Sequence, residues 1–197
     1  MPFIRKLGPT DLNRLKDHFA RLDYNDRYLR FGHQISDSAV NDYLERIDWT
    51  QAIVLGQLEN GVLRGAVEIV PFGSSVPEKA ELALTVEKPW RGAGVGRELC
   101  RNALILACNR GIHDVMMICL AENVPMQRIA RKLNGRVMRL DGEIESRVIL
   151  PRPGPWSLLQ EGLMGSAAIV GEVADQWATR QVSNECGAPA ADDRSAA

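Results

Sequence analysis

The sequence predicts one mixed α/β domain built on a mostly antiparallel sheet with a single β-α-β unit. Two β-rich runs, residues 52–58 and 62–70, are joined through Asn60-Gly61, the strongest short hairpin signal because both residues tolerate positive φ. Residues 80–86 alternate apolar and polar side chains, as in a half-buried strand. After a long helix, residues 114–120 form an apolar run typical of a buried parallel strand. Antiparallel strands that feed one such unit argue against a doubly wound sheet.

The N-terminal part is expected to hold one strand and two helices before the hairpin. Residues 3–7 are a short apolar strand candidate. Pro9-Thr10-Asp11 is typical of a helix start, and Ser36-Asp37-Ser38 can cap a second helix. Residues 71–77, with a glycine and two serines, then form a loop that leads to the central strand.

The last part of the domain is expected to contain a short helix and a hairpin. Asn123 leads into the helix, and residues 136–140 and 143–150 form the hairpin through Asp141-Gly142. The domain therefore spans residues 1–150.

The C-terminal part is expected to be an appendage of the domain. Residues 151–182 read as a proline-rich linker followed by a helix with one apolar side, which either dimerises or covers the sheet. Residues 183–197 are small and polar and are expected to be disordered.

Composition indicates an ordinary water-soluble protein, for which the cytoplasm is the default location. The chain has 197 residues, a net charge of -1 and a pI near 6.3, so no overall positive field indicates a nucleic-acid partner. It lacks a signal-peptide pattern and any run of roughly 18 apolar residues, which argues against a membrane partner. Cys100, Cys108 and Cys119 lie in apolar runs and are interpreted as buried thiols. The three histidines lack metal-ligand spacing, so no metal is expected.

The most informative stretch is the glycine-rich turn RGAGVG at residues 91–96, between a strand and a long helix. Its members are Arg91, Gly92, Ala93, Gly94, Val95 and Gly96. Three glycines let several backbone N–H groups converge, and the following helix N-terminus favours an anion. The turn is therefore predicted to bind a diphosphate. The dinucleotide fingerprint G-x-G-x-x-G and the Walker pattern both fail here, so the turn alone does not identify the nucleotide.

These residues resemble the GNAT superfamily of acyl-CoA-dependent N-acyltransferases. The family motif Arg/Gln-x-x-Gly-x-Gly/Ala is matched by Arg91, Gly94 and Gly96, with Val86 five residues earlier. The resemblance covers roughly residues 1–150 and includes the order of the elements. It implies a mixed, mostly antiparallel sheet with helices on both faces and a splayed central parallel pair. Residues 27–31, RYLRF, further resemble the GNAT modules of bacterial protein-lysine acetyltransferases.

The resemblance implies that acetyl-CoA is the cosubstrate. Its diphosphate would lie on the backbone of residues 91–96, where Arg97 is a further candidate contact, although an exposed helix face explains Arg97 equally well. The pantetheine arm would run along a strand edge formed by Leu84, Thr85 and Val86. Asn123 either contacts this arm or caps the helix that follows it.

The resemblance also implies direct acetyl transfer to a primary amine, on a protein lysine or a small molecule. Because such an amine has a pKa near 10, a base must remove a proton before attack. Glu81 is the first candidate, since it alternates away from Leu82 and Leu84 and family members carry an acid there. Glu68 on the neighbouring strand is the second. For each, the alternative is a solvated strand position.

One departure from the family concerns the general acid. Many members carry a tyrosine on the fourth helix, but Ala130 stands at the aligned position and no tyrosine follows Tyr43. The acid is therefore unassigned, and the thiolate would leave without one or take a proton from water or the new ammonium. The missing tyrosine also permits a second function, a non-catalytic acyl-CoA-binding regulatory module. An oxidoreductase is a weaker alternative because its fingerprint fails.

Overall fold

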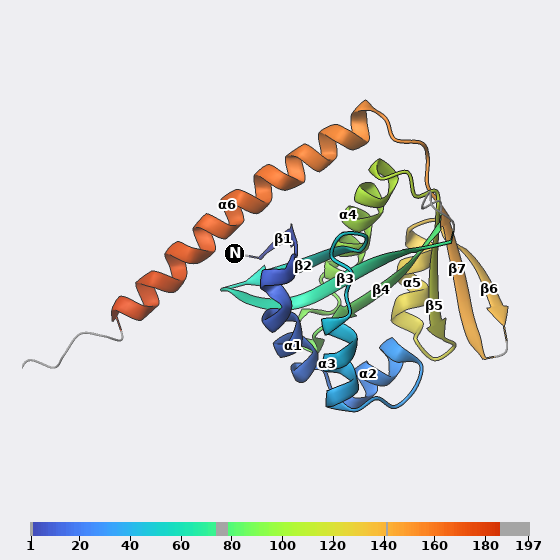
Figure 1. The fold of residues 1–197 in the computed structure, drawn as a ribbon, viewed down its shortest axis with the longest axis horizontal. Coiled ribbons are helices and arrows are strands. Elements are labelled where there is room, and N and C mark those ends of the chain that lie inside the picture. Colours follow the sequence, from blue (N-terminus) through green and yellow to red (C-terminus); the bar gives the residue numbers. More distant parts are fainter. Residues whose placement is uncertain (1, 74–78, 141, 186–197) are drawn as a thin grey trace, which may run out of the picture.

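The protein folds around one seven-stranded sheet (Figure 1). The structure is a computed structural model, and it describes residues 2–73, 79–140 and 142–185. The strands are β1 (Phe3–Lys6), β2 (Ile53–Glu59), β3 (Val62–Phe72), β4 (Lys79–Val86), β5 (Asp114–Leu120), β6 (Arg136–Leu140) and β7 (Glu143–Ile149). The helices are α1 (Leu12–Arg21), α2 (Tyr24–Phe31), α3 (Asp37–Glu45), α4 (Val95–Asn109), α5 (Val124–Lys132) and α6 (Pro155–Glu185).

The sheet has the order β1-β2-β3-β4-β5-β7-β6, and its one parallel pair is β4 with β5. The antiparallel hairpin of β2 and β3 turns at Asn60 and Gly61, whose φ angles of 51° and 74° are those that this dipeptide favours. β4 continues this meander, and α4 then returns the chain to β5. The predicted mixed sheet with a splayed parallel pair is confirmed.

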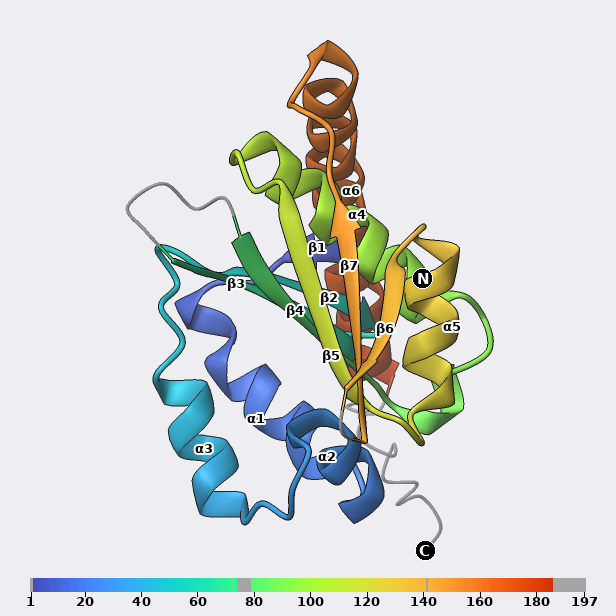
Figure 2. The ribbon, with the colours of Figure 1, turned by 90° about the vertical axis from the view of Figure 1, so that its right-hand side faces the viewer.

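Helices cover both faces of the sheet and bury a separate core on each (Figure 2). On one face, α4 and α5 pack through residues such as Leu99 and Ala130 against Leu82 and Met117. On the other face, α1 and α3 pack with β2 and β3 around Leu15. The three cysteines Cys100, Cys108 and Cys119 are free and buried, as predicted.

Two features of the fold differ from the simplest interpretation of the sequence. Three helices, not two, precede β2, because residues 24–31 form α2 with Asp23 as its N-cap and Gly32, at φ 76°, as its C-cap. The final hairpin is also inserted in reverse, so that β7 lies between β5 and β6.

The C-terminal appendage is one long helix, α6, which packs on α4 and β1 and continues past the domain (Figure 1). It starts at Pro155, after the proline-rich linker, and is described to Glu185. Most of the tail that was expected to be disordered, residues 186–197, lies outside the described residues. Among the helices that the structure describes, none combines the length and apolar character needed to cross a membrane.

Candidate active site

The glycine turn forms an open cradle at the N-terminus of α4. Gly92 and Gly94 have φ angles of 85° and 88°, and Gly94 is the N-cap of the helix. A Cβ at either would meet no other atom, so the backbone conformation, and not lack of space, favours glycine there. Residues 91–94 are exposed. The first N–H groups of α4 lack helical partners and lie at the positive end of the helix, directly after these exposed residues.

Gly96 has a different role in the same turn. Its Cβ would lie 3.0 Å from Leu84 Cδ2 and 3.1 Å from Ile129 Cδ1. The first turn of α4 therefore sits directly against β4 and α5, which brings the cradle next to the strand edge.

Arg91 fixes the position of the turn through its side chain. Its Nε donates to the Val86 carbonyl at 2.8 Å, and its guanidinium lies 2.7 Å from the buried carboxylate of Asp26 on α2. A second ion pair joins Lys88 to Asp23. Since the Arg91 guanidinium is already engaged, the contribution of this residue to anion binding is its backbone and the geometry it imposes.

β4 and β5 separate partway along their length and leave an unpaired strand edge. Their register pairs Lys79 with Asp114, Ala80 with Val115 and Glu81 with Met116, and stops there. β4 nevertheless continues to Val86, still paired with β3 on its other side. Backbone groups of residues 82–86 on the β5 side are thus available to an extended ligand, as in β-strand addition.

The three candidate cofactor contacts on this edge have different surroundings. Leu84 and Val86 are partly buried against the α4 core, whereas the Thr85 side chain points to the other face. There the hydroxyl lies 2.9 Å from His18 Nε2 and 3.4 Å from the Ala66 carbonyl. The structure therefore leaves Thr85 only its backbone for ligand contacts.

Glu87, directly after β4, is the centre of a buried polar network. Its carboxylate lies 3.1 Å from His18 Nδ1 and accepts from Arg21 Nε at 2.8 Å and Arg64 at 3.1 Å. Burial opposes ionisation, but these hydrogen bonds outweigh it and lower the pKa of Glu87 to about 2. The network ties α1 and β3 to the end of β4, and so holds the strand that leads into the glycine turn.

The two predicted carboxylates lie on the same face of the sheet but in different environments. Glu81 is exposed, on the face opposite Leu82, and is the last β4 residue paired with β5 before the strands separate. Glu68 on β3 lies directly across from Ala83 on β4, so it is a diagonal neighbour of Glu81. In antiparallel pairs the Cα atoms of such diagonal neighbours are about 7–8 Å apart.

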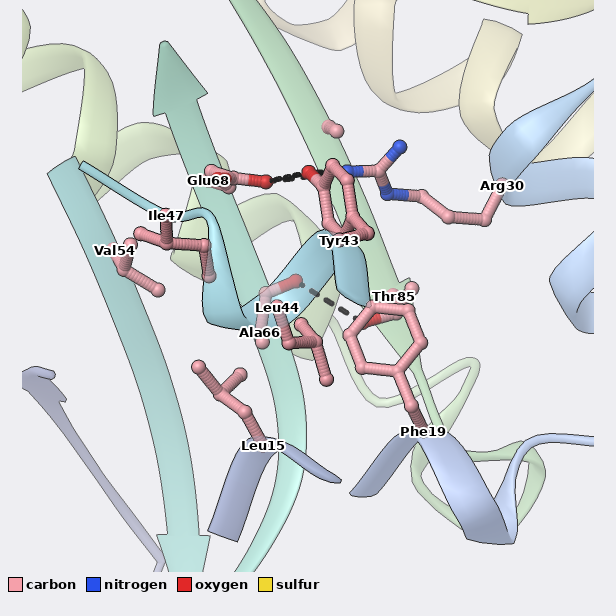
Figure 3. A pocket seen from close by; sticks show the side chains of 11 residues that line it. Leu15, Phe19, Arg30, Tyr43, Leu44, Ile47, Val54, Ala66, Glu68 and Thr85 are labelled. Atoms are coloured by element: carbon pink, nitrogen blue, oxygen red, sulfur yellow. Dashed lines mark hydrogen bonds and ion pairs between the residues drawn. The ribbon is translucent and has the colours of Figure 1, made fainter. Parts of the chain in front are cut away.

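Glu68 is held by two side chains that the sequence did not single out as site residues (Figure 3). Tyr43 on α3 donates its hydroxyl to the Glu68 carboxylate, and Arg30 on α2 donates to the same oxygen at 3.2 Å. Arg30 also donates to the Tyr43 oxygen at 2.7 Å. Burial is the main reason that the pKa of Tyr43 is raised above its usual range, so the phenol is protonated at neutral pH. These residues border a cavity of about 20 Å³, room for about one water molecule.

A weak signal for Tyr43 was present in the sequence. Val40, Tyr43, Leu44 and Ile47 recur at helical spacing on the face that packs on the sheet. A tyrosine on a core-facing stripe needs a partner for its hydroxyl, and a glutamate within the apolar run of β3 is one. Arg30 lies within the segment 27–31 that resembles other GNAT modules, but its contact with Glu68 depends on α2, which the residue pattern alone did not predict.

The remaining candidate residues lie around the cradle. Asn123 is the N-cap of α5, and its side chain accepts from the Met126 N–H at 3.2 Å, so the capping alternative is observed. Arg97 is exposed on the first turn of α4. In the described parts of the chain, no group of three or more His, Cys, Asp or Glu side chains is placed to hold a metal ion.

Comparison with known proteins identifies solved structures that share this architecture. The GNAT domain of S. lividans PAT superposes with a TM-score of 0.67 at 21% identity, over 75% of this chain and 89% of that one. The protein yncA from Salmonella typhimurium, whose structure was solved with acetyl-CoA, gives a TM-score of 0.61 at 16% identity, over 78% of this chain and 96% of that one. A ribosomal-protein-alanine N-acetyltransferase from Brucella melitensis gives 0.60 at 19% identity, over 75% and 99%. At these identities the likeness establishes the fold.

The family is established by sequence. The model of the family described as "Acetyltransferase (GNAT) domain" matches residues 3–136, well over half of the chain. This range contains the glycine turn, the separated strands and both candidate carboxylates. The chain belongs to the GNAT acetyltransferase family.

Proposed function

We propose that the protein transfers an acetyl group from acetyl-CoA to a primary amine, on a protein lysine or a small molecule. One observation carries this proposal: an open anion cradle, an unpaired strand edge and an exposed carboxylate meet where β4 and β5 separate. A nucleotide diphosphate, an extended amide-containing arm and a reacting thioester need these three features in this order.

The cosubstrate fits the residues around the cradle. Backbone N–H groups of residues 92–96 would hold the diphosphate, because the conformation of Gly92 and Gly94 opens them to solvent. The pantetheine amides would bond to the free edge of residues 84–86, with the side chains of Leu84 and Val86 beside the arm. The exposed Arg97 would add a positive charge near the phosphates.

Proton removal is the chemical task of this chain's own side chains. The amine arrives as an ammonium, loses a proton to a carboxylate, and its nitrogen attacks the thioester carbonyl carbon; the carbon–sulfur bond then breaks and the thiolate leaves. Glu81 is the proposed base, since it is exposed at the point where the strands part. Glu68 is less suited as a base because Tyr43 and Arg30 already occupy its carboxylate. The thiolate takes its proton from water or from the new ammonium.

The acceptor is an amine whose ammonium is drawn to the exposed carboxylate of Glu81. Glu81 and Glu68 lie on one face of the sheet, and Glu68 with its partners Arg30 and Tyr43 lines a small cavity beside Ala83. One protein of the same fold bears the name of a ribosomal-protein-alanine N-acetyltransferase, which supports an amine of a protein; a small amine remains the alternative.

The direct test is the Glu81→Gln variant, assayed by release of CoA thiol over a panel of lysine peptides and small amines. We expect kcat to fall by about 10²- to 10⁴-fold, the usual contribution of a general base, while acetyl-CoA still raises the melting temperature. Glu143→Gln, which neutralises an exposed glutamate elsewhere on the sheet, is the matched control and should leave turnover unchanged. If acetyl-CoA binds but no amine is acetylated by the unaltered protein, the chain is a binding module and the enzymatic proposal is wrong.

A further inference from the structure

The C-terminal helix α6 presents opposite faces of unusual character. The face toward the domain contains Ser157, Glu161, Met164, Ala168 and Gly171, spaced alternately four and three residues apart and partly buried. The face toward solvent contains large apolar side chains. A helix that packs on a domain normally buries its large apolar side chains and exposes its polar ones, so α6 has the reverse arrangement.

The inner face contacts the domain near Ser157 and again at Gly171, and between these contacts a cavity of about 190 Å³ is lined by Met164 and Ala168. Asn109 on α4 donates to the Ser157 carbonyl at 3.1 Å and to the Glu161 carboxylate at 2.6 Å. At Gly171 the helix approaches β1 so closely that a Cβ would lie 2.4 Å from Phe3 Cγ. α6 therefore cannot rotate to bury its other face without losing these contacts.

The outer face carries a regular heptad seam. Its positions are Trp156, Leu159, Leu163, Ser166, Val170 and Val173, separated by three and four residues in alternation, the repeat of a coiled-coil a/d seam. The five large side chains in it are 50–69% exposed. An exposed apolar seam with a period of 3.5 residues is typical of a helix that packs against another helix, whereas a solvent-exposed surface helix does not need one.

The surroundings of the seam indicate which partner fits. Between Trp156 and Ala174 the only charged residues are Glu161, which Asn109 holds, and Glu172, whose carboxylate lies 3.9 Å from Arg5 Nε. Within residues 156–174, the outer face thus has no lysine or arginine to attract an anionic membrane surface. It also carries no charge that would repel an identical face.

The seam is complementary to itself in the antiparallel direction. If two copies align so that each a position meets a d position, Trp156 faces Val173, Leu159 faces Val170 and Leu163 faces Ser166, each pair occurring twice about the two-fold axis. Every exposed seam residue then has a partner, and each larger side chain meets a smaller one. At roughly 100 Å² for each large side chain, two seams bury about 1,000 Å², the lower limit for a specific interface.

We propose that the outer face of α6 is a dimerisation surface, on which a second copy of this chain packs through an antiparallel helix pair. The interface is symmetric and lies on the side of the domain where α6 packs on β1 and α4. The proposal does not depend on the proposed enzymatic activity.

The first test is the molar mass of the full chain by light scattering and sedimentation from about 1 to 200 µM. We expect a dimer, and a monomer for Leu163→Glu/Val170→Glu and for the milder Leu163→Ser/Val170→Ser. Leu158→Glu is the matched control, because Leu158 is 57% exposed on the same helix but lies outside the seam. Circular dichroism and the acetyl-CoA thermal shift verify that each variant is folded. A monomer for the unaltered protein at 200 µM, or a dimer that survives both double variants, overturns the proposal.

A second test addresses the direction of pairing. In a Cys186→Ser background, a Leu159→Cys chain is mixed with a Val170→Cys chain and oxidised. Antiparallel pairing gives a disulfide between the two different chains. Parallel pairing would instead give Leu159→Cys homodimers, and that result would overturn the antiparallel arrangement.

Discussion

The buried carboxylate of Glu87 allows a quantitative test of the network that positions the glycine turn. Replacing Glu87 by Gln keeps the shape but removes the charge that His18, Arg21 and Arg64 surround. In the folded protein the pKa of Glu87 is lowered from 4.5 to about 2, which corresponds to at most about 3 kcal/mol of stabilisation at neutral pH. Since the Arg21 side chain is 36% exposed, solvent screening reduces this to about 2 kcal/mol.

The sign of the pH dependence follows from the direction of this shift. Because the folded-state pKa is the lower one, the stabilisation is fully present above the unfolded-state value and is lost as the pH falls from about 4.5 toward 2. At pH 7 we expect Glu87→Gln to lower the melting temperature by about 4–8 °C for a domain of this size. The difference in unfolding free energy between the two proteins should shrink as the pH falls to 3.

Urea unfolding at several pH values from 7 to 3 measures that difference directly. Asp11, whose pKa is also lowered to about 2, contributes equally to both proteins and cancels. Glu81→Gln, at an exposed position on β4, the strand that ends just before Glu87, is the control and should change stability little. If the difference in unfolding free energy between the unaltered protein and Glu87→Gln stays constant from pH 7 to pH 3, the proposed role of the Glu87 charge in this network is refuted.

Two further substitutions test the glycine cradle and the Glu68 side-chain cluster beside the proposed acceptor site. Gly94→Ala places a Cβ on a residue at φ 88°, so we expect the protein to be less stable by about 1 kcal/mol and to bind acetyl-CoA more weakly in calorimetry. Gly154→Ala, whose Cβ would meet no other atom, is the control and should change neither quantity. Normal acetyl-CoA binding by Gly94→Ala would contradict the role of the turn. Tyr43→Phe removes the hydroxyl that donates to Glu68 and leaves Arg30 as the partner of that carboxylate. We expect the free energy of unfolding in urea to fall by about 1–3 kcal/mol and the KM for the amine to rise. No change in either quantity would count against a role for Tyr43 in holding Glu68.

Local chemistry in the sequence was sufficient to predict most of the fold. Asn60-Gly61 specifies a hairpin by itself, and the glycine turn between a strand and a helix specifies the β-α-β unit. The α2 helix was missed because it is only eight residues long and rich in polar and charged side chains, so that the helical spacing of Tyr24, Tyr28 and Phe31 was overlooked. The reversed insertion of β7 was also not predictable, since pairing between distant strands is not encoded in either strand alone.

The parts of the candidate site that depend on backbone chemistry were predictable from the sequence. The parts that depend on contacts between distant elements were less predictable. The cradle depends on glycines at fixed spacing, which are visible in the sequence. The surroundings of Glu81 and Glu68 depend on how β4, α2 and α3 meet, so sequence could name both carboxylates but could not show that one is exposed and the other held by Tyr43. The predicted ligand contact at Thr85 is a strand-like backbone contact and stays a prediction; that the side chain hydrogen-bonds to His18 on α1 could not be read from the sequence.

The identity of the ligand that the glycine turn binds is central to the proposed function. The measurement that tests it most directly is the shift in melting temperature with acetyl-CoA, NAD and ATP in parallel. A ligand at a hundred times its Kd stabilises the folded protein by about 2.7 kcal/mol, which corresponds to about 5–10 °C for a domain of this size. We predict a shift of that order with acetyl-CoA and none with NAD or ATP. A shift with NAD, or with none of the three, would contradict the assignment of this turn to acetyl-CoA.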